Sequence, residues 1–261
     1  MKHWLAFPLV LCCAGAIAQD NTDSEIWNKV RTSLFGARPI AEDESQVRLR
    51  LPARAADAGA VPLAVEAAAG PGAAKRLYVI IEKNPSPIAA IVEFGEASGG
   101  ALLETRVRVE EYTWVRAIVE RQDGSLAMSK RFIKAAGGCS APAGKSLAER
   151  LKGMGEMKWR VEQMSTPSGA SAVQLLVRHP NNSGLAMDQL TRLYDPPHYV
   201  RSLRVTLDGR LVLNADVDFS LSENPSLRFL VAGGEAGTLR ADIVDSRDQE
   251  FEGEVSFPRA R

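Results

Sequence analysis

The sequence predicts an all-β fold in which two antiparallel β-sandwiches are joined by a flexible, glycine-rich arm. From about Val47 onward, hydrophobic and polar residues alternate, which is the pattern of half-buried strands. Turn residues such as Asp123-Gly124 separate many short segments of this kind. A stretch without large hydrophobic side chains, residues 135–144, divides the alternating pattern into two parts. Many short strands with regular turns favour antiparallel sandwiches over a parallel sheet.

The N-terminus has the features of a secretory signal peptide. Lys2 is followed by an apolar run over residues 4–18 that ends in Ala16-Ile17-Ala18, a small-x-small cleavage site. The run is shorter than the about 20 residues that span a bilayer. We therefore expect export to the periplasm, with a mature chain that begins near Gln19 and has no membrane anchor.

Cleavage would leave one thiol in the mature chain. Cys12 and Cys13 lie within residues 1–18, so Cys139 is the cysteine that remains. A single cysteine in an exported protein is buried, paired with another chain, or kept as a reactive thiol.

A short helix is expected ahead of the first sandwich. Residues 24–34 place Ile26, Trp27, Val30 and Leu34 on one face, and Ser24 is a suitable N-cap.

The strand pattern then gives two immunoglobulin-like sandwiches. Apolar alternating residues such as Val107, Val109, Leu203 and Val205 should face inward, and Asp208-Gly209 predicts a tight hairpin in the second half. The predicted organisation is a signal peptide (1–18), a helical segment (19–46), a first sandwich (47–134), an arm and linker (135–169) and a second sandwich (170–261).

Cys139 is the candidate functional residue. Gly137 and Gly138 precede it and small residues follow it, so nothing bulky shields its sulfur and the backbone is free to move. We expect an exposed, mobile thiol that reacts at nearly the rate of a free one, with Lys134 and Lys145 favouring the thiolate. The alternative is a buried structural cysteine, a common fate for free cysteines.

Several motifs resemble SoxY and SoxZ, the two subunits of a sulfur-oxidation carrier. Asn84-Pro85-Ser86-Pro87 is similar to a strand entry of SoxY, and Gly137-Gly138-Cys139 resembles its terminal arm. The second half resembles SoxZ at residues 178–180, 197–200 and 222–229. The chain thus looks like a SoxYZ-like fusion of the kind associated with quinoprotein dehydrogenases.

This resemblance implies a non-catalytic carrier. Cys139 would be the covalent attachment site of a small sulfur-containing substrate such as thiosulfate, and Gly137 and Gly138 would be the carrier arm. The implied partners are periplasmic sulfur-oxidation enzymes or a quinoprotein dehydrogenase system, and the two halves would pack together. The arm of SoxY ends its chain, whereas residues 140–261 follow Cys139 here. The alternative function is an accessory module for a periplasmic quinoprotein dehydrogenase.

Two other chemistries would use the histidines of the second half. His179 and His198 with Cys139 could form a copper site, or one histidine could activate the thiol. Structural histidines beside Pro180 and Pro197 are the simpler interpretation. Lys+Arg and Asp+Glu both number 32, so no overall charge favours nucleic acid or an anionic membrane. No glycine-rich phosphate loop is present, and we expect no bound metal or cofactor.

Overall fold

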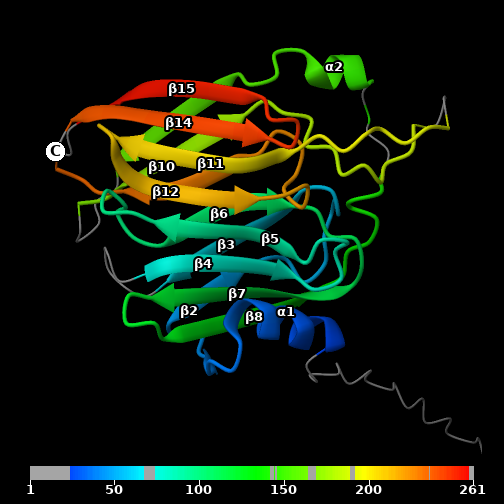
Figure 1. The fold of residues 1–261 in the computed structure, drawn as a ribbon, viewed down its shortest axis with the longest axis horizontal. Coiled ribbons are helices and arrows are strands. Elements are labelled where there is room, and N and C mark those ends of the chain that lie inside the picture. Colours follow the sequence, from blue (N-terminus) through cyan, green and yellow to red (C-terminus); the bar gives the residue numbers. More distant parts are fainter. Residues whose placement is uncertain are drawn as a thin grey trace, which may run out of the picture.

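The computed structural model describes residues 24–67, 74–141, 144, 146–163, 169–188, 192–234 and 236–258. The predicted signal peptide lies outside these ranges. Figure 1 shows two stacked sheets, which confirms the predicted all-β sandwich class. Neither helix within the described ranges is long and apolar enough to cross a membrane.

The chain forms its elements in a simple order. The first half contains α1 (Glu25–Phe35), β1 (Ile40–Glu42), β2 (Val47–Arg50), β3 (Val61–Ala67), β4 (Ala74–Ile81), β5 (Ile88–Phe94), β6 (Leu102–Val107), β7 (Thr113–Arg121) and β8 (Leu126–Ile133). The second half contains α2 (Leu147–Leu151), β9 (Met157–Gln163), β10 (Ser171–Val177), β11 (Val200–Leu207), β12 (Arg210–Val217), β13 (Ser226–Val231), β14 (Gly237–Asp245) and β15 (Glu250–Phe257).

Strands of both halves form both sheets. The nine-stranded sheet has the order β1-β8-β7-β4-β5-β12-β11-β14-β15, and the six-stranded sheet has the order β2-β3-β6-β13-β10-β9. The halves meet where β5 pairs with β12 over several residues and where Glu104 of β6 pairs with Arg228 of β13. The two predicted sandwiches therefore join edge to edge. In both sheets, each pair of neighbouring strands in these orders is antiparallel, except that β1 is parallel to β8.

One hydrophobic core runs through both halves. The predicted inward residues Val107, Val109, Leu203 and Val205 are all buried in it. The Asp208-Gly209 hairpin also forms as predicted, since both residues have positive φ, 48° and 81°, the backbone that a tight two-residue turn requires.

Two strands fall where the sequence predicted none. β9 lies inside the expected linker, where its Met157 and Trp159 pack against the core. β1 lies inside the expected helical segment. Both occupy sheet edges, where β1 is only three residues long and carries little sequence pattern.

Helix α1 covers part of the nine-stranded sheet. Ser24 caps it as predicted, accepting from Trp27 N–H at 3.0 Å. Trp27 and Phe35 are buried, but Ile26, expected on the same face, is 38% exposed. The guanidinium of Arg116 lies 4.3 Å from the centroid of the Trp27 ring and forms a buried ion pair with Glu82 at 2.6 Å.

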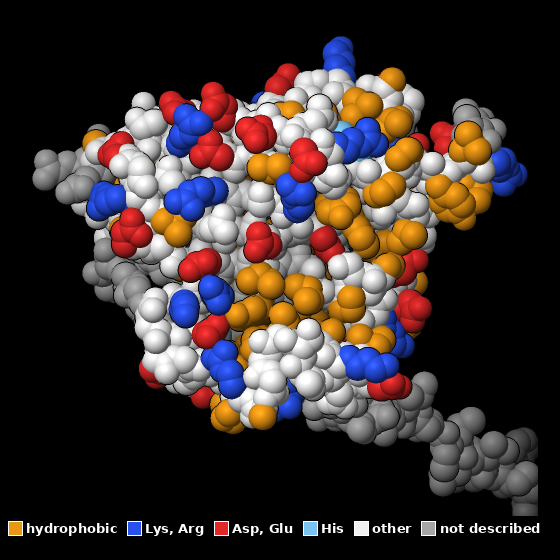
Figure 2. Space-filling model, viewed as in Figure 1, with side chains coloured by type: hydrophobic (Ala, Val, Ile, Leu, Met, Phe, Trp, Pro, Cys, Tyr) orange, Lys and Arg blue, Asp and Glu red, His pale blue; other side chains and the backbone are white. Residues whose placement is uncertain are grey.

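The outer surface mixes both charges. Figure 2 shows basic and acidic side chains intermingled over the upper part of one face, and on β14 Arg240 pairs with Asp242 at 2.9 Å and Glu254 at 3.3 Å. Leu193 and Tyr194, between β10 and β11, are the most exposed large hydrophobic side chains of the described ranges.

Candidate functional site

Cys139 lies between β8 and α2 and is buried. Its exposed fraction is 2%, and it forms no disulfide. The prediction of an exposed thiol is therefore wrong, and the mobility of the arm stays a prediction. The sequence around Cys139 lacks bulky side chains, but neighbours from distant parts of the chain shield the sulfur.

The backbone of this segment is docked on the connection between β6 and β7. Gly137 N–H donates to the carbonyl of Glu110 at 2.8 Å, and Gly138 N–H donates to that of Val109 at 3.0 Å. The Glu110 carboxylate then accepts from Cys139 N–H at 2.8 Å and from the Ser140 hydroxyl at 2.6 Å. Glu110 thus fixes both the thiol residue and its neighbour.

The two glycines serve close packing in this conformation. Gly137 has φ +78°, a region that favours glycine. A Cβ on Gly138 would lie 2.1 Å from the carbonyl oxygen of Ala58. The predicted role of these glycines was freedom of movement, whereas in the docked segment they allow a close backbone approach.

Asn84, the first residue of the Asn-Pro-Ser-Pro motif, supports the same connection. Its amide donates to the carbonyl of Arg108 at 2.8 Å, and its side-chain oxygen accepts from Glu110 N–H at 2.9 Å. The motif therefore positions the residue that holds Cys139.

The second half closes the site. The Ser183 hydroxyl donates to the carbonyl of Cys139. Beside the thiol is a cavity of about 240 Å³ whose walls come from both halves. Its lining includes Asp57, Arg106, Arg108, Gly138, Cys139, Arg150, Asn182, Ser183, Ser222 and Glu223.

The environment keeps the thiol protonated at neutral pH. Burial raises the pKa of Cys139 to about 12, the Glu110 carboxylate acts in the same direction, and the Arg108 guanidinium opposes both. The cation that lowers the pKa of the thiol is thus Arg108 and not the expected Lys134. Lys145, the other lysine expected to act here, lies outside the described residues. Since the thiolate is the reactive form, the docked thiol is in an unreactive state.

The two histidines form a buried triad with Asp245. His198 Nε2 lies 2.6 Å and His179 Nε2 3.4 Å from the same Asp245 oxygen. His179 Nδ1 accepts from Asn181 N–H at 3.1 Å, so in the neutral ring the proton is on Nε2 and points to Asp245. Burial and the neighbouring His198 lower the pKa of His179 to about 4.

This geometry is that of a hydrogen-bonded structural cluster. A metal at His179 Nε2 would need the lone pair there and a proton on Nδ1, where the Asn181 N–H already donates. The predicted structural role of both histidines fits this arrangement. Cys139 is not part of this group of side chains, which are close enough to share an ion, so the described residues do not assemble a copper site from the two histidines and Cys139.

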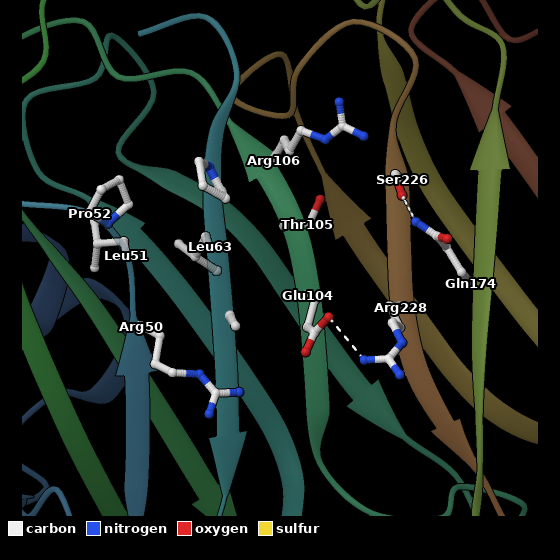
Figure 3. Close-up of a pocket in the computed structure, with 12 residues that line it drawn as sticks. Arg50, Leu51, Pro52, Leu63, Glu104, Thr105, Arg106, Gln174, Ser226 and Arg228 are labelled. Carbon is white, nitrogen blue, oxygen red and sulfur yellow. Dashed lines mark hydrogen bonds and ion pairs between the residues drawn. The ribbon is translucent and has the colours of Figure 1, made fainter. Parts of the chain in front are cut away.

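A larger groove crosses the six-stranded sheet but does not contain the thiol. It holds about 500 Å³ and is lined by residues of β2, β3, β6, β10 and β13. Figure 3 shows that its polar side chains largely pair with each other, Glu104 with Arg228 at 3.2 Å and Gln174 with Ser226 at 2.9 Å. Arg106, drawn at one end without such a pair, also lines the cavity beside Cys139.

Sequence reasoning missed the residues that surround Cys139. Glu110, Ser183 and Arg150 carry no motif, and they lie 29, 44 and 11 positions from Cys139 in a chain with many similar residues. It also missed Asp245, which unites the two histidines. The strand alternation that ends at Val109 indicated a turn at Glu110, but no feature of the sequence indicated that the Glu110 carboxylate binds the backbone of Cys139.

Comparisons with known proteins identify both halves. Residues 31–139 match the family of the sulfur oxidation protein SoxY, and residues 159–256 match that of the sulphur oxidation protein SoxZ. No curated protein matches the chain. Among solved structures, the sulfur carrier protein SoxY from Chlorobium limicola f thiosulfatophilum is 22% identical, with a TM-score of 0.34, covering 42% of this chain and 94% of that one.

A β-glycosidase from Bacteroides vulgatus is 9% identical, with a TM-score of 0.25, covering 84% of this chain and 25% of that one. The two family matches follow each other in the order expected of a fusion and together take in most of the chain. The chain therefore belongs to the SoxYZ-like sulfur-oxidation carriers, with a SoxY domain and a SoxZ domain in one polypeptide.

Proposed function

We propose that this protein is a periplasmic carrier that binds a small sulfur-containing substrate covalently through Cys139 and presents it to partner enzymes. The observation that carries the proposal is the position of Cys139 at the wall of a polar cavity, at the last residue of the SoxY match. It is also the free cysteine of the described residues. The chain itself supplies attachment, and its partners supply the catalysis.

The buried thiol makes undocking a part of this function. A partner's active site can reach Cys139 only after the segment from Gly137 to Ala141 leaves its place. The bonds to be broken are few and lie mainly at Glu110, Val109 and Ser183. The docked conformation then protects an empty carrier from oxidation, and a partner that stabilises the undocked segment loads it.

Loading requires an electron acceptor. Joining the Cys139 sulfur to the sulfane sulfur of a substrate forms an S–S bond, releases the thiol proton and removes two electrons. A partner oxidoreductase must accept these electrons, which fits the expected sulfur-oxidation enzymes or quinoprotein dehydrogenase system.

Intact-mass measurement of the protein purified from its native host tests the proposal. A carrier should show adducts that a reducing agent removes and that are absent from Cys139→Ser. N-terminal sequencing of the same sample should find a chain that begins near Gln19. An unmodified Cys139 under conditions of active sulfur oxidation, or full pathway activity of Cys139→Ser, contradicts it.

The burial of Cys139 favours a second candidate, an accessory module for a quinoprotein dehydrogenase in which the thiol has no role. This module should bind and support the dehydrogenase equally well with Cys139→Ser. Dehydrogenase activity with each protein in turn separates the two functions.

A further inference from the structure

Two of the cations that line the cavity beside Cys139, Arg106 and Arg108, form no ion pair with a carboxylate of the described residues. One terminal nitrogen of Arg108 donates to the carbonyls of Asn181 and Phe219, both at 2.8 Å, and to that of Leu221. Within the described part of the chain, Arg108 forms no ion pair. Glu223 and Asp218 act on it through space, and burial lowers the pKa of its guanidinium. A half-buried cation whose hydrogen bonds go to neutral carbonyls is stabilised further by an anion in direct contact with it.

A second set of groups in the cavity walls has unused hydrogen-bonding capacity. Arg150 Nε, Asn182 Nδ2 and Ser222 Oγ are buried atoms without a partner among the described residues. All three residues are more than nine-tenths buried and line this cavity. Native structures satisfy nearly all such groups, and these three are all hydrogen-bond donors. Three unsatisfied donors around one cavity are what an acceptor-rich ligand requires.

The remaining nitrogens of Arg150 show that the side chain is already fixed. One donates to the Asn182 side-chain oxygen and the other to Asp195. Its guanidinium therefore needs little ordering on binding, which favours affinity. Arg106 adds an exposed guanidinium that forms no ion pair within the described ranges.

Size and charge restrict the ligand. The cavity of about 240 Å³ is below the roughly 300–1,000 Å³ of pockets for drug-sized molecules. Asp57 and Glu223 also line it, but Asp57 is exposed and bonded to Gly59 N–H at 2.8 Å, and Glu223 is half-buried. Water screens these acids more than it screens Arg108 and Arg150. Guanidinium groups bind oxyanions with short, charge-assisted hydrogen bonds.

We propose that this cavity is a binding site for a small oxyanion, with Arg106 and Arg108 supplying the charge and Arg150, Asn182 and Ser222 supplying further hydrogen-bond donors. The occupant is the negatively charged end of the group attached to Cys139, such as a sulfonate. The identity of that occupant rests on the proposed carrier function, whereas anion binding itself does not. The site selects anionic cargo and holds it beside the sulfur until a partner undocks the segment.

Binding of free anions to Cys139→Ala tests the site without the thiol. Thiosulfate and sulfate are titrated by calorimetry, with chloride at matched ionic strength as the reference. Saturable binding of both oxyanions is expected. Adding Arg106→Met should weaken it about tenfold or more, the effect of losing one charge-assisted hydrogen bond. Arg106 is exposed, so this variant should fold, which circular dichroism checks.

Arg50→Met is the matched control. Arg50 is an exposed strand arginine that lines only the larger groove, and its replacement should leave binding unchanged. Binding that does not saturate, that follows ionic strength alone, or that falls equally in both variants overturns the anion site.

Intact mass separates this inference from the carrier function. If the wild-type chain shows reducible adducts but the protein binds no anion, the carrier function stands and the anion site is refuted. If the protein binds anions but shows no adducts, the anion site stands and the carrier function is refuted. A carrier of anionic cargo gives both, and its adduct should be released more readily by a reductant in Arg106→Met.

Discussion

Reactivity of the Cys139 thiol tests whether the docked segment exists in solution and whether Glu110 holds it. The pKa of this thiol rises from 9.0 to about 12, so at neutral pH its thiolate fraction falls by about a thousandfold. Burial slows access further. Wild-type protein should therefore react with a soluble disulfide reagent at least about a thousandfold more slowly than a free thiol, in contrast to the near-free rate expected from sequence.

Glu110→Ala should release the thiol. The variant removes the acceptor of three bonds, from Cys139 N–H at 2.8 Å, Ser140 N–H at 3.2 Å and the Ser140 hydroxyl at 2.6 Å. The two shorter bonds, from Cys139 N–H and the Ser140 hydroxyl, contribute roughly 1.5 kcal/mol each, or about 3 kcal/mol together. This corresponds to an about hundredfold higher population of the undocked segment. Removing the carboxylate also lowers the pKa of the thiol. Labelling should accelerate by about a hundredfold or more.

Glu111→Ala is the control for this experiment. Glu111 is the exposed neighbour of Glu110 and pairs with Lys83 at 3.7 Å, so its loss should not change the labelling rate. Stopped-flow measurement with the folded proteins gives the rates, and denatured protein gives the free-thiol reference. A wild-type rate near that reference refutes the burial, and equal rates for Glu110→Ala and Glu111→Ala refute the role of Glu110.

The remaining predictions concern stability. The pKa of His179 is about 4 in the folded chain, against an ordinary 6.5, so the folded state takes up this proton less readily than the unfolded state. The contribution of His179 to the free energy of unfolding is therefore fully present above pH 6.5, and up to about 3 kcal/mol of it is lost as the pH drops towards 4. Urea unfolding should give a lower midpoint at pH 5 than at pH 7. Equal midpoints would contradict the lowered pKa. Gly138→Ala should destabilise the fold by roughly 1–3 kcal/mol, because its Cβ meets Ala58. Gly144→Ala, in open space, should have little effect, and equal melting temperatures for the two variants would argue against the docked segment. Cys139→Ser places a hydroxyl in a buried site and should lose about 1–3 kcal/mol, more than the 0.5 kcal/mol typical of surface changes; a neutral effect in thermal denaturation would indicate an exposed thiol. Arg116→Met leaves the buried Glu82 carboxylate without its cationic partner and should lose about 3–5 kcal/mol. Adding Glu82→Gln should restore part of this loss in a double-mutant cycle, and additive losses would mean that the pair is not coupled.

The sequence predicted many strands and turns correctly because these elements depend on residues that are close together along the chain. Val107 and Val109 alternate with arginines and turn inward, as do Leu203 and Val205. Asp208-Gly209 forms its hairpin because both residues tolerate positive φ. Ser24 caps α1 because its hydroxyl reaches Trp27 N–H. Two edge strands were missed. β1 has only three residues and so carries little pattern. In β9, Met157, Trp159 and Val161 alternate with charged residues, but the strand lies in a stretch that was assigned to the linker.

The sequence by itself determined that Cys139 lies among small residues outside the strands, and that two strand-rich halves flank it. Only the tertiary structure decided what that thiol can do. Its segment is held in place by residues distant in sequence: Ala58 lies against Gly138, and Glu110 and Ser183 form hydrogen bonds with the backbone of Cys139. The same packing brings Arg106, Arg108 and Arg150 around one cavity. Burial and pKa depend on every neighbour in space, and the order of residues along a chain does not specify those neighbours.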